Sequence, residues 1–444
     1  MKKNSFYIVS LGCAKNLVDS NVLAQLLEAE GLTYSRSARQ AEFVLVNTCG
    51  FIHDAQQESL DTLQELTTKR NQGQKIIATG CLAERWRDKL LRLQPQLNGL
   101  IGTRSLEDIL PLVQSMKKGS KQANGTAYPN YPALRYPFGA SYTAIQGSSS
   151  YLKIADGCHR FCAFCAIPGI KGPLVSRSQS DVIQDALFLQ SEGIQEINLI
   201  AQDLTAYGID RAEQDGLANL LNLLLPQIPD VPWVRLLYTY PGMVSDRLID
   251  LMAAENQLLP YLDIPLQHAD PTVLKQMRRP SDIDWVRKTI KKMRALIPSL
   301  VVRTTFIVGY PNETEDSFQT LVDFVEGTKF DHLGVFTYSP EEDTESFNLP
   351  DMVPQEVKDE RRERLMELQS HIANEKNQAL IGQTLNVLVE GQDETQGIIV
   401  GRSYRDAPEI DGLVVARGSN PAAEIIPVKI ESAGPYDLFG SVIS

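Results

Sequence analysis

Three cysteines stand within eight residues of one another, at Cys158, Cys162 and Cys165. Thiolates are the usual protein ligands of iron–sulfur clusters, and an electron carrier commonly binds its four-iron cluster through four of them. Three thiolates hold such a cluster but leave its fourth iron without a protein ligand, so that a substrate can chelate it. The spacing therefore predicts a four-iron cluster that takes part in chemistry rather than one that only carries electrons.

Other uses of these three thiols fit less well. A disulfide would pair two of them and leave the third alone. A structural zinc site needs four nitrogen or sulfur ligands, and the nearby His159 is adjacent to Cys158, which makes joint ligation of one ion awkward. A redox Cys-x-x-Cys pair would not need Cys158. Phe161 and Phe164, between the ligands, are expected either to be core residues or to shield the cluster from water, which would tune its potential.

The cysteines Cys13, Cys49 and Cys81 each follow a short apolar run that we expect to be a β-strand. In an open α/β sheet, ligands bind at the edge where the carboxyl ends of neighbouring parallel strands meet. Three thiols delivered to that edge predict a second three-cysteine site. The alternative is three independent buried cysteines, which are common in protein cores.

The elements around these cysteines alternate between strands and helices up to about residue 117, which predicts an open α/β domain with a parallel sheet. The N-terminal segment faintly resembles an export signal, but its apolar stretch is short and a helical pattern follows at once, so a first strand is expected. The expected strands are 5–11, 41–48 and 75–79, and the expected helices are 17–30, 53–69, 82–93 and 106–117.

A longer β/α alternation begins at residue 149 and predicts a full or partial barrel of six units. Binding sites on such barrels lie at the carboxyl ends of the strands. The loop of Cys158 should therefore lie at the same end of the barrel as the polar groups that follow the other strands. The expected strands are 152–155, 196–201, 233–238, 261–266, 301–308 and 332–338, and the clearest helices are 181–191, 284–295 and 315–325.

The remaining segments complete four predicted regions. Residues 118–148 lose periodicity and predict a linker. A long charged helix at 355–376 is expected to be a solvated connector, and short strands at 384–390, 397–404, 412–416 and 423–430 predict a small all-β barrel. The predicted limits are 1–117 for the first domain, 118–148 for the linker, 149–379 for the β/α barrel and 380–444 for the terminal barrel.

Composition and charge narrow the expected partners. The chain has 444 residues, of which 43% are hydrophobic and 22% charged, as in soluble globular proteins. No apolar run is long enough to span a bilayer, and six cysteines in a chain without an evident signal favour a reducing compartment, the cytoplasm. The net charge of −12 argues against nucleic-acid binding as the main function of the protein and favours a basic protein as its partner.

The Cys-x3-Cys-x2-Cys run on a predicted β/α barrel resembles the radical S-adenosylmethionine superfamily. The three upstream cysteines and the small terminal barrel, which resembles the TRAM module, are similar to its methylthiotransferase branch. Four segments of this chain are similar to the corresponding segments of those members of the branch that modify a ribosomal protein. They are residues 11–20, 47–52, 199–203 and 261–268. Members that modify tRNA carry Gln-Ser-Gly where this chain has Gln267-His268-Ala269. Ala14 departs from the proline expected in many ribosomal-protein-modifying members, but it is not a proposed ligand.

The resemblance implies two 4Fe–4S clusters, with S-adenosylmethionine as both radical source and methyl donor. Cys158, Cys162 and Cys165 would hold the cluster that cleaves S-adenosylmethionine to a 5′-deoxyadenosyl radical. The three upstream cysteines would hold the cluster that presents the sulfur. The implied reaction replaces a hydrogen on the β-carbon of an aspartate, in the twelfth protein of the small ribosomal subunit, by a methylthio group.

Further site residues follow from the resemblance. The predicted contacts of S-adenosylmethionine are Gln202, Asp203, Arg177, Gly309, Pro311 and Glu313. The segment 309–313 resembles the family's segment beside the adenine and ribose, and an ordinary strand-to-helix turn is the equal alternative. Gln202 and Asp203 either line the cofactor pocket or cap a turn. Arg177 either pairs with the cofactor carboxylate or lies at the surface, and His268 is as readily structural as functional. No catalytic acid or base is assigned.

The terminal barrel helps to choose between substrates. Residues 383–444 hold four Lys and Arg against nine Asp and Glu. An RNA-binding module is expected to be basic, whereas an acidic module is suited to binding a basic ribosomal protein. This protein could be bound free or within the ribosome. The alternative is a structural cap whose charge only aids solubility. The expected partners also include a reducing electron donor. A membrane is not expected as a partner, and tRNA is disfavoured as a substrate.

Three other functions compete with this prediction. The first is the same chemistry on an adenosine derivative in tRNA. The second, from a different class, is an iron–sulfur carrier or scaffold without catalysis, which would leave the three-ligand sites unexplained. The third is a radical enzyme that inserts sulfur without methyl transfer, which the mass of the product would distinguish.

Overall fold

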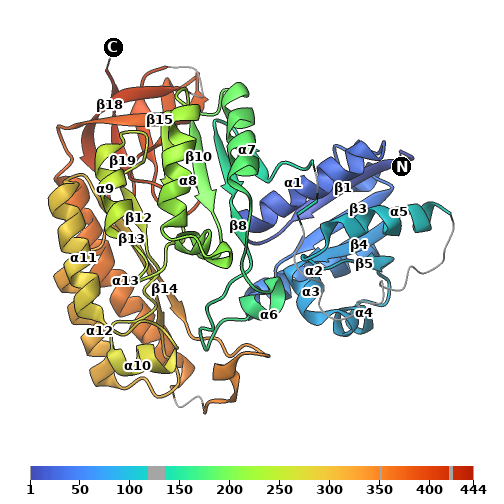
Figure 1. Ribbon diagram of the computed structural model, residues 1–444, viewed down its shortest axis with the longest axis horizontal. Helices are drawn as coiled ribbons and strands as arrows, with labels where there is room; N and C mark the ends of the chain where they lie inside the picture. Colours follow the sequence, from blue (N-terminus) through green and yellow to red (C-terminus); the bar gives the residue numbers. More distant parts are fainter. Residues whose placement is uncertain (1, 119–135, 138, 351–352, 420–423, 444) are drawn as a thin grey trace. The chain divides into compact units, whose positions relative to one another are not determined.

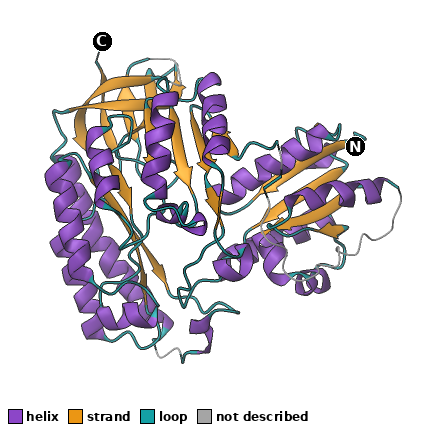
Figure 2. Cartoon of the chain, viewed as in Figure 1, coloured by secondary structure: helices purple, strands orange, loops and turns teal. Residues whose placement is uncertain are grey.

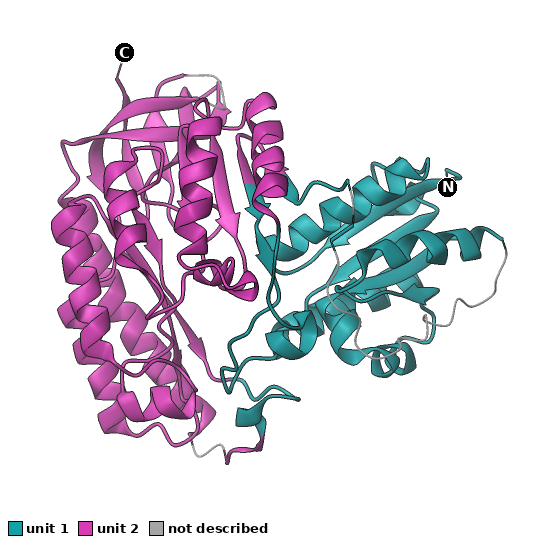
Figure 3. Cartoon of the chain, viewed as in Figure 1, with its two compact units in different colours: residues 1–144, 151–177, 339–347 teal, residues 145–150, 178–338, 348–444 magenta. Residues whose placement is uncertain are grey.

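The computed structural model describes residues 2–118, 136–137, 139–350, 353–419 and 424–443. The chain forms two compact units (Figure 3), each built from several chain segments. Unit 1 takes in residues 1–144, 151–177 and 339–347, and unit 2 takes in residues 145–150, 178–338 and 348–444. Most of the predicted linker at 118–148 lies outside the described residues, and its described part includes strand β6 (Thr143–Gln146). The predicted domain limits stay a prediction.

Unit 1 contains the predicted parallel sheet, with the strand order β2-β1-β3-β4-β5. The chain moves from β1 out to β2 and then returns to β3 on the other side of β1. This reversal creates a topological switch point at the carboxyl edge between β1 and β3, where open sheets bind ligands. The strands are β1 (Ser5–Ser10), β2 (Thr33–Tyr34), β3 (Phe43–Thr48), β4 (Lys75–Gly80) and β5 (Gly99–Leu100).

Helices cover this sheet (Figure 1), and the burial of apolar side chains between the layers stabilises it. All six residues of β3 are buried, as expected of a central parallel strand. The predicted helix at 82–93 is two helices, because Arg87 between them has φ +40°. The helices are α1 (Ala14–Ala29), α2 (His53–Thr68), α3 (Cys81–Trp86), α4 (Asp88–Leu93) and α5 (Ile109–Lys117).

Unit 1 also includes the segment that carries the second set of cysteines. Strand β8 (Ala155–Asp156) pairs antiparallel with β9 (Val175–Ser176), and α6 (Ile167–Lys171) lies between them in the chain. The cysteine loop connects β8 to α6. The pairing of β8 with β9 therefore closes the base of this loop.

Unit 2 contains five of the six predicted β/α barrel strands, and the predicted strand at 152–155 lies in unit 1. The β/α strands of unit 2 pair in parallel: β10 pairs with β11, and β12, β13 and β14 form a further sheet. The first two residues of β7 (Ser149–Lys153) also belong to this unit. The strands are β10 (Glu196–Ile200), β11 (Trp233–Leu236), β12 (Tyr261–Asp263), β13 (Val301–Val308) and β14 (His332–Thr337). The helices are α7 (Gln179–Ser191), α8 (Gly216–Leu224), α9 (Asp246–Ala254), α10 (Pro271–Gln276), α11 (Ile283–Leu296) and α12 (Glu315–Thr328).

The chain ends in the predicted small barrel, which follows the long helix α13 (Gln355–Gln378) and consists of strands without helices (Figure 2). Its five strands close in the order β15-β16-β17-β19-β18, and β18 pairs with β15. A buried ion group joins it to the β/α barrel: Glu196 binds Arg235 at 2.9 Å and Arg402 at 2.6 Å. The strands are β15 (Thr384–Asp393), β16 (Ile398–Ser403), β17 (Val414–Arg417), β18 (Ile425–Ala433) and β19 (Leu438–Val442).

None of the helices in the described part of the chain combines enough length with enough apolar character to cross a membrane.

Candidate metal centres

The three upstream cysteines lie at one edge of the unit 1 sheet. Cys13 follows β1 and precedes α1, Cys49 follows β3, and Cys81 follows β4 as the first residue of α3. Because β1, β3 and β4 are neighbours and run parallel, their carboxyl ends bring the three cysteines together at the switch point. Their role as ligands stays a prediction.

Two glycines allow these loops to approach one another closely. A Cβ atom at Gly12 would lie 2.8 Å from the Cβ of Cys49, and one at Gly80 would lie 2.2 Å from Oδ1 of Asn47. Both glycines also have positive φ angles, +86° and +91°, which other residues rarely adopt. A larger residue at either position would push the cysteine loops apart.

The buried side chain of Asn16 ties the same loops together. Its Nδ2 donates to the carbonyl oxygens of Leu11 and Thr48, both at 3.0 Å, and its Oδ1 lies 3.4 Å from Sγ of Cys81. Asn47 in turn donates to the carbonyl oxygen of Asn16 at 2.7 Å. The prediction from sequence did not include Asn16, because its type and position on a helix give no sign that it is 1% exposed.

The surroundings of the three thiols differ in burial and charge. Cys13 is exposed, Cys49 half-buried and Cys81 buried. Burial raises the pKa of Cys49, and the backbone N–H of Phe51 opposes this shift. Burial also raises the pKa of Cys81, and the nearby Lys171 ammonium acts in the opposite direction. The negative charge of Cys13 raises the pKa of both thiols. Metal binding, which requires thiolates, must therefore release protons here.

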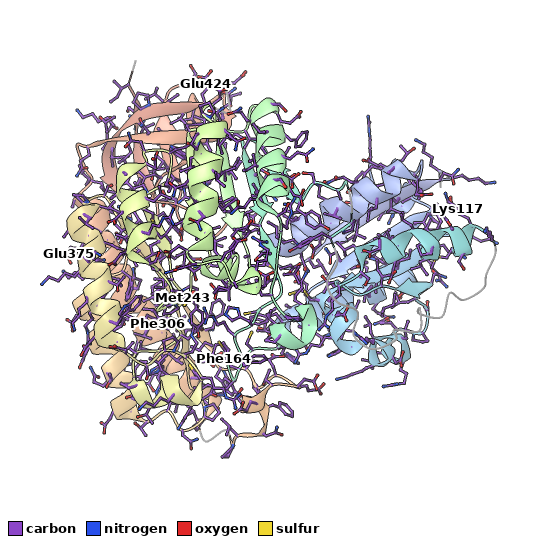
Figure 4. All side chains as sticks on the ribbon, viewed as in Figure 1. Lys117, Phe164, Met243, Phe306, Glu375 and Glu424 are labelled. Carbon is purple, nitrogen blue, oxygen red and sulfur yellow. The ribbon has the colours of Figure 1, made fainter. Side chains whose placement is uncertain are left out.

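The second set of cysteines lies in the loop between β8 and α6, and Cys158, Cys162 and Cys165 are all half-buried. The N–H of Cys158 donates to the carbonyl oxygen of Gly172 at 3.0 Å, and that of Cys165 donates to the carbonyl oxygen of Cys162 at 3.0 Å. These bonds fold the loop so that the thiols stay within reach of solvent. Phe161 is 68% exposed and so is not a core residue, whereas Phe164 (Figure 4) is half-buried.

Both sets of thiols have the donor chemistry of an iron–sulfur cluster. All six cysteines are free of disulfides. Each set supplies three thiolates, the donor type that such clusters use.

The two cysteine-bearing segments meet inside unit 1. Cys81, Ala166 and Ile170 form one buried apolar cluster, so the start of α3 packs against α6, which follows the cysteine loop directly. A further segment, 339–347, also belongs to this unit. Its Glu341 accepts hydrogen bonds from the N–H of His53 at 2.9 Å and from Arg85 at 3.0 Å.

The face of β13 and β14 that points away from the helices, which we call the concave face, carries side chains that the prediction missed. On β13, Phe306 (Figure 4) is buried. Its ring centroid lies 6.5 Å from that of Phe324 of α12, so this face of the strand packs against the helices. The opposite face presents Thr305 and Ile307, which are half-buried, and the register pairs Ile307 with Phe336 of β14. Phe336 is 55% exposed. An aromatic ring on a strand that faces away from the helices offers a stacking surface.

The predicted contacts of S-adenosylmethionine after β10 and β13 lie in turns of unit 2. Gln202 is half-buried, and Asp203 is buried and accepts a hydrogen bond from Thr205 at 2.6 Å. The carboxylate of Glu313 accepts from the N–H of Gly309 at 2.7 Å and from Arg361 at 2.9 Å. Glu313 therefore holds the turn itself.

Other predicted residues are buried as well. Pro311 is buried, and a Cβ at Gly309 would lie 2.2 Å from Cγ of Lys358. Arg177 belongs to unit 1, unlike the other predicted contacts. It is 5% exposed, donates to the carbonyl oxygen of Lys153 at 2.9 Å and lies over the ring of Tyr142, so the surface alternative for Arg177 is wrong.

His268 is fully buried. Its Nδ1 accepts a hydrogen bond from the N–H of Asp270 at 2.9 Å, and its Nε2 lies 3.6 Å from the carboxylate of Glu313. The hydrogen bond from Asp270 holds the start of α10 in place, so it gives His268 a structural role.

Family models match most of the chain. Residues 5–102 match the Uncharacterized protein family UPF0004, residues 152–325 match the Radical SAM superfamily, and residues 381–443 match the TRAM domain. Among solved structures, the radical S-adenosylmethionine methyltransferase TsrM from Kitasatospora setae is similar with a TM-score of 0.55 and 15% identity, covering 74% of this chain and 72% of that one. The cobalamin-dependent enzyme OxsB is similar with a TM-score of 0.51 and 11% identity, covering 83% and 56%. These two likenesses confirm the fold.

Curated relatives match over their full length. The ribosomal protein uS12 methylthiotransferase RimO of Syntrophotalea carbinolica is 40% identical, covering 100% of this chain and 98% of the relative. That of Crocosphaera subtropica is 40% identical, covering 99% of both chains. That of Thermosynechococcus vestitus is 41% identical, covering 99% and 97%. With relatives at about 40% identity over the full chain and matches to the UPF0004, Radical SAM and TRAM models, the chain belongs to the RimO family of ribosomal protein methylthiotransferases.

Proposed function

We propose that this chain transfers a methylthio group to the β-carbon of an aspartate in ribosomal protein uS12. The observation that carries the proposal is the full-length similarity to RimO relatives, combined with two three-thiol sites in one compact unit. When bound, two 4Fe–4S clusters and S-adenosylmethionine would supply the electron, the carbon radical, the sulfur and the methyl group. An unactivated C–H bond needs such cofactors, because side-chain acids and bases do not break it.

The chain's own residues would hold and orient these groups. Cys158, Cys162 and Cys165 would ligate one cluster from a loop that stays half-open to solvent, which leaves room for S-adenosylmethionine to reach the open iron. Cys13, Cys49 and Cys81 would ligate the other cluster at the sheet edge.

The barrel of unit 2 would bind the cofactor's nucleoside. We assign the concave-face pair Ile307 and Phe336 as its apolar contact, since aromatic rings stack on bases. Gln202 and Asp203 remain proposed polar contacts. Gly309, Pro311 and Glu313 would act by shaping the turn after β13. Arg177 would orient the start of the cysteine loop through the carbonyl oxygen of Lys153.

The charge of the terminal barrel supports a basic protein substrate over tRNA. Of the four Lys and Arg in residues 383–444, Arg402 is 1% and Arg405 9% exposed, so these two cations face inward. The acidic side chains outnumber the cations that remain outside, which favours attraction to a basic protein. We also propose a reducing electron donor and a cytoplasmic location, where uS12 is made and the thiols stay reduced.

Product analysis tests this function. The protein is purified anaerobically, reconstituted with iron and sulfide, reduced, and given S-adenosylmethionine together with either uS12 or tRNA. We expect iron for two four-iron clusters and a methylthio mass increase on a uS12 aspartate. A methylthio group on tRNA alone would favour the second substrate, a product without the methyl group would indicate sulfur insertion, and absence of S-adenosylmethionine cleavage would favour a carrier.

A further inference from the structure

Four of the charged side chains that unit 1 buries form one connected group, to which the proposed reaction gives no role. They are Asp19 on α1, Lys153 at the end of β7, Asp156 at the end of β8 and Lys171 at the end of α6, which we call the buried quartet. Their side chains are only 1–2% exposed. A buried charge is costly unless it is paired and hydrogen-bonded, and the quartet balances two positive charges with two negative ones.

The two lysines of the buried quartet bridge the same two carboxylates. Nζ of Lys171 lies 2.7 Å from Oδ2 of Asp19 and 3.2 Å from Oδ2 of Asp156, and it also donates to Oγ1 of Thr103 at 2.6 Å. Nζ of Lys153 binds the other oxygen of Asp19 and lies 2.9 Å from Oδ2 of Asp156. The two lysines therefore make the same pair of ion contacts.

The buried quartet connects the segments that carry the two cysteine sets. Asp19 lies on α1, the helix that begins directly after Cys13. Asp156 stands two residues before Cys158 in the chain, and Lys171 ends the helix that follows the cysteine loop. A change in the buried quartet therefore affects both the helix that follows Cys13 and the segment that contains the Cys158 loop.

Lys171 differs from Lys153 in its relation to Cys81. The neighbouring Ile170 packs in one apolar cluster with Cys81. Nζ of Lys171 also binds Asp19, which lies three residues after Asn16 on α1, and Oδ1 of Asn16 lies 3.4 Å from Sγ of Cys81. The buried ammonium of Lys171 is therefore connected to the upstream set of cysteines through Ile170 on its own helix and through α1.

We propose that Lys171 is a positioning residue for the cluster assigned to Cys13, Cys49 and Cys81, and that its buried ammonium raises the reduction potential of that cluster. The inference rests on the proposed function, because that function assigns the cluster. Reduction adds a negative charge to a thiolate-bound cluster, and a cation at short range in a medium of low dielectric constant stabilises the reduced form more. Lys153 makes the same ion pairs, but the apolar cluster of Cys81 is formed with Ala166 and Ile170, on the side of Lys171.

The matched lysines give a direct test. In the full chain with Cys158, Cys162 and Cys165 replaced by Ala, one reconstituted cluster is expected, on the upstream cysteines. Its midpoint potential is measured by a redox titration followed by electron paramagnetic resonance. We expect Lys171→Met to shift the midpoint to more negative values and Lys171→Arg, which keeps the charge, to restore it. Lys153→Met, which loses equivalent ion pairs, should shift the midpoint less than Lys171→Met does.

The possible results separate the two proposals. Equal midpoints for Lys171→Met and Lys153→Met would overturn the role of Lys171 and leave the proposed function standing. A parent chain that binds no iron in this background would overturn the cluster assignment itself. If Lys171→Met does not fold, the charge-balanced pair Lys171→Met with Asp156→Asn replaces it. This pair should still shift the midpoint to more negative values, and an unchanged midpoint would again refute the inference.

Discussion

The proposed function gives the two sets of thiols separate tasks, and single substitutions should separate these tasks. Cys162→Ala should abolish release of 5′-deoxyadenosine, because the half-buried loop set is assigned to S-adenosylmethionine cleavage. Cys49→Ala should keep that release and lose the methylthio product. Mass spectrometry of both products in one reaction measures the two effects. If Cys49→Ala methylthiolates uS12 at the parent's rate, the sheet-edge assignment is wrong.

Asn16 should matter for the same sheet-edge site although it is not a ligand. Asn16→Ala removes the amide that joins the carbonyl oxygens of Leu11 and Thr48, and each buried group left without a partner costs about 1–3 kcal/mol. We expect less iron per chain on the upstream cysteines and a lower melting temperature. Asn21→Ala, which alters a more exposed amide of the same helix, is the matched control and should retain its iron.

At the level of elements, the pairing of β13 with β14 places a stacking surface on the barrel's concave face. Phe336→Ala should weaken binding of S-adenosylmethionine by about tenfold, since a base stacked on an aromatic ring gains about 1–3 kcal/mol. Equilibrium binding to the reconstituted protein measures the effect. Phe188→Ala removes a ring of similar exposure from α7 and should leave binding unchanged. Equal losses for the two variants would exclude the concave face as the nucleoside contact.

Regular elements were predictable because their patterns are strong, and the exceptions have local causes. The parallel sheet, the small terminal barrel and five of the six barrel strands followed from apolar runs at regular spacing and are confirmed, whereas the predicted strand at 152–155 is divided between β7 and β8. Strand β19 was missed, since it contains Gly440, a poor strand former that is needed here because a Cβ would lie 2.1 Å from the carbonyl oxygen of Lys429. Asn16, Phe336 and Lys171 were missed because their environments depend on pairing between distant segments.

For the molecule as a whole, the buried group around Glu196 links stability to pH. Burial alone would raise the pKa of Glu196, but Arg235 and Arg402 lower it to about 2. The ordinary value is about 4.3, so the ion group contributes its full stability, roughly 3 kcal/mol, above that pH and loses it as the pH falls through about 2. Denaturant unfolding of the parent and of Glu196→Gln between pH 5 and 3 should show a steeper loss in the parent. Parallel curves would contradict this account.

Unit 1 is completed late in the chain, because segment 339–347 reaches it only after the whole β/α barrel has been traversed. During synthesis, about three quarters of the protein must leave the ribosome before Glu341 is available to brace the helices beside Cys49 and Cys81. A cluster bound at the sheet edge would therefore meet a fully braced site only once this segment has emerged. A shortened chain that stops ahead of it would offer the same thiols on an unbraced scaffold.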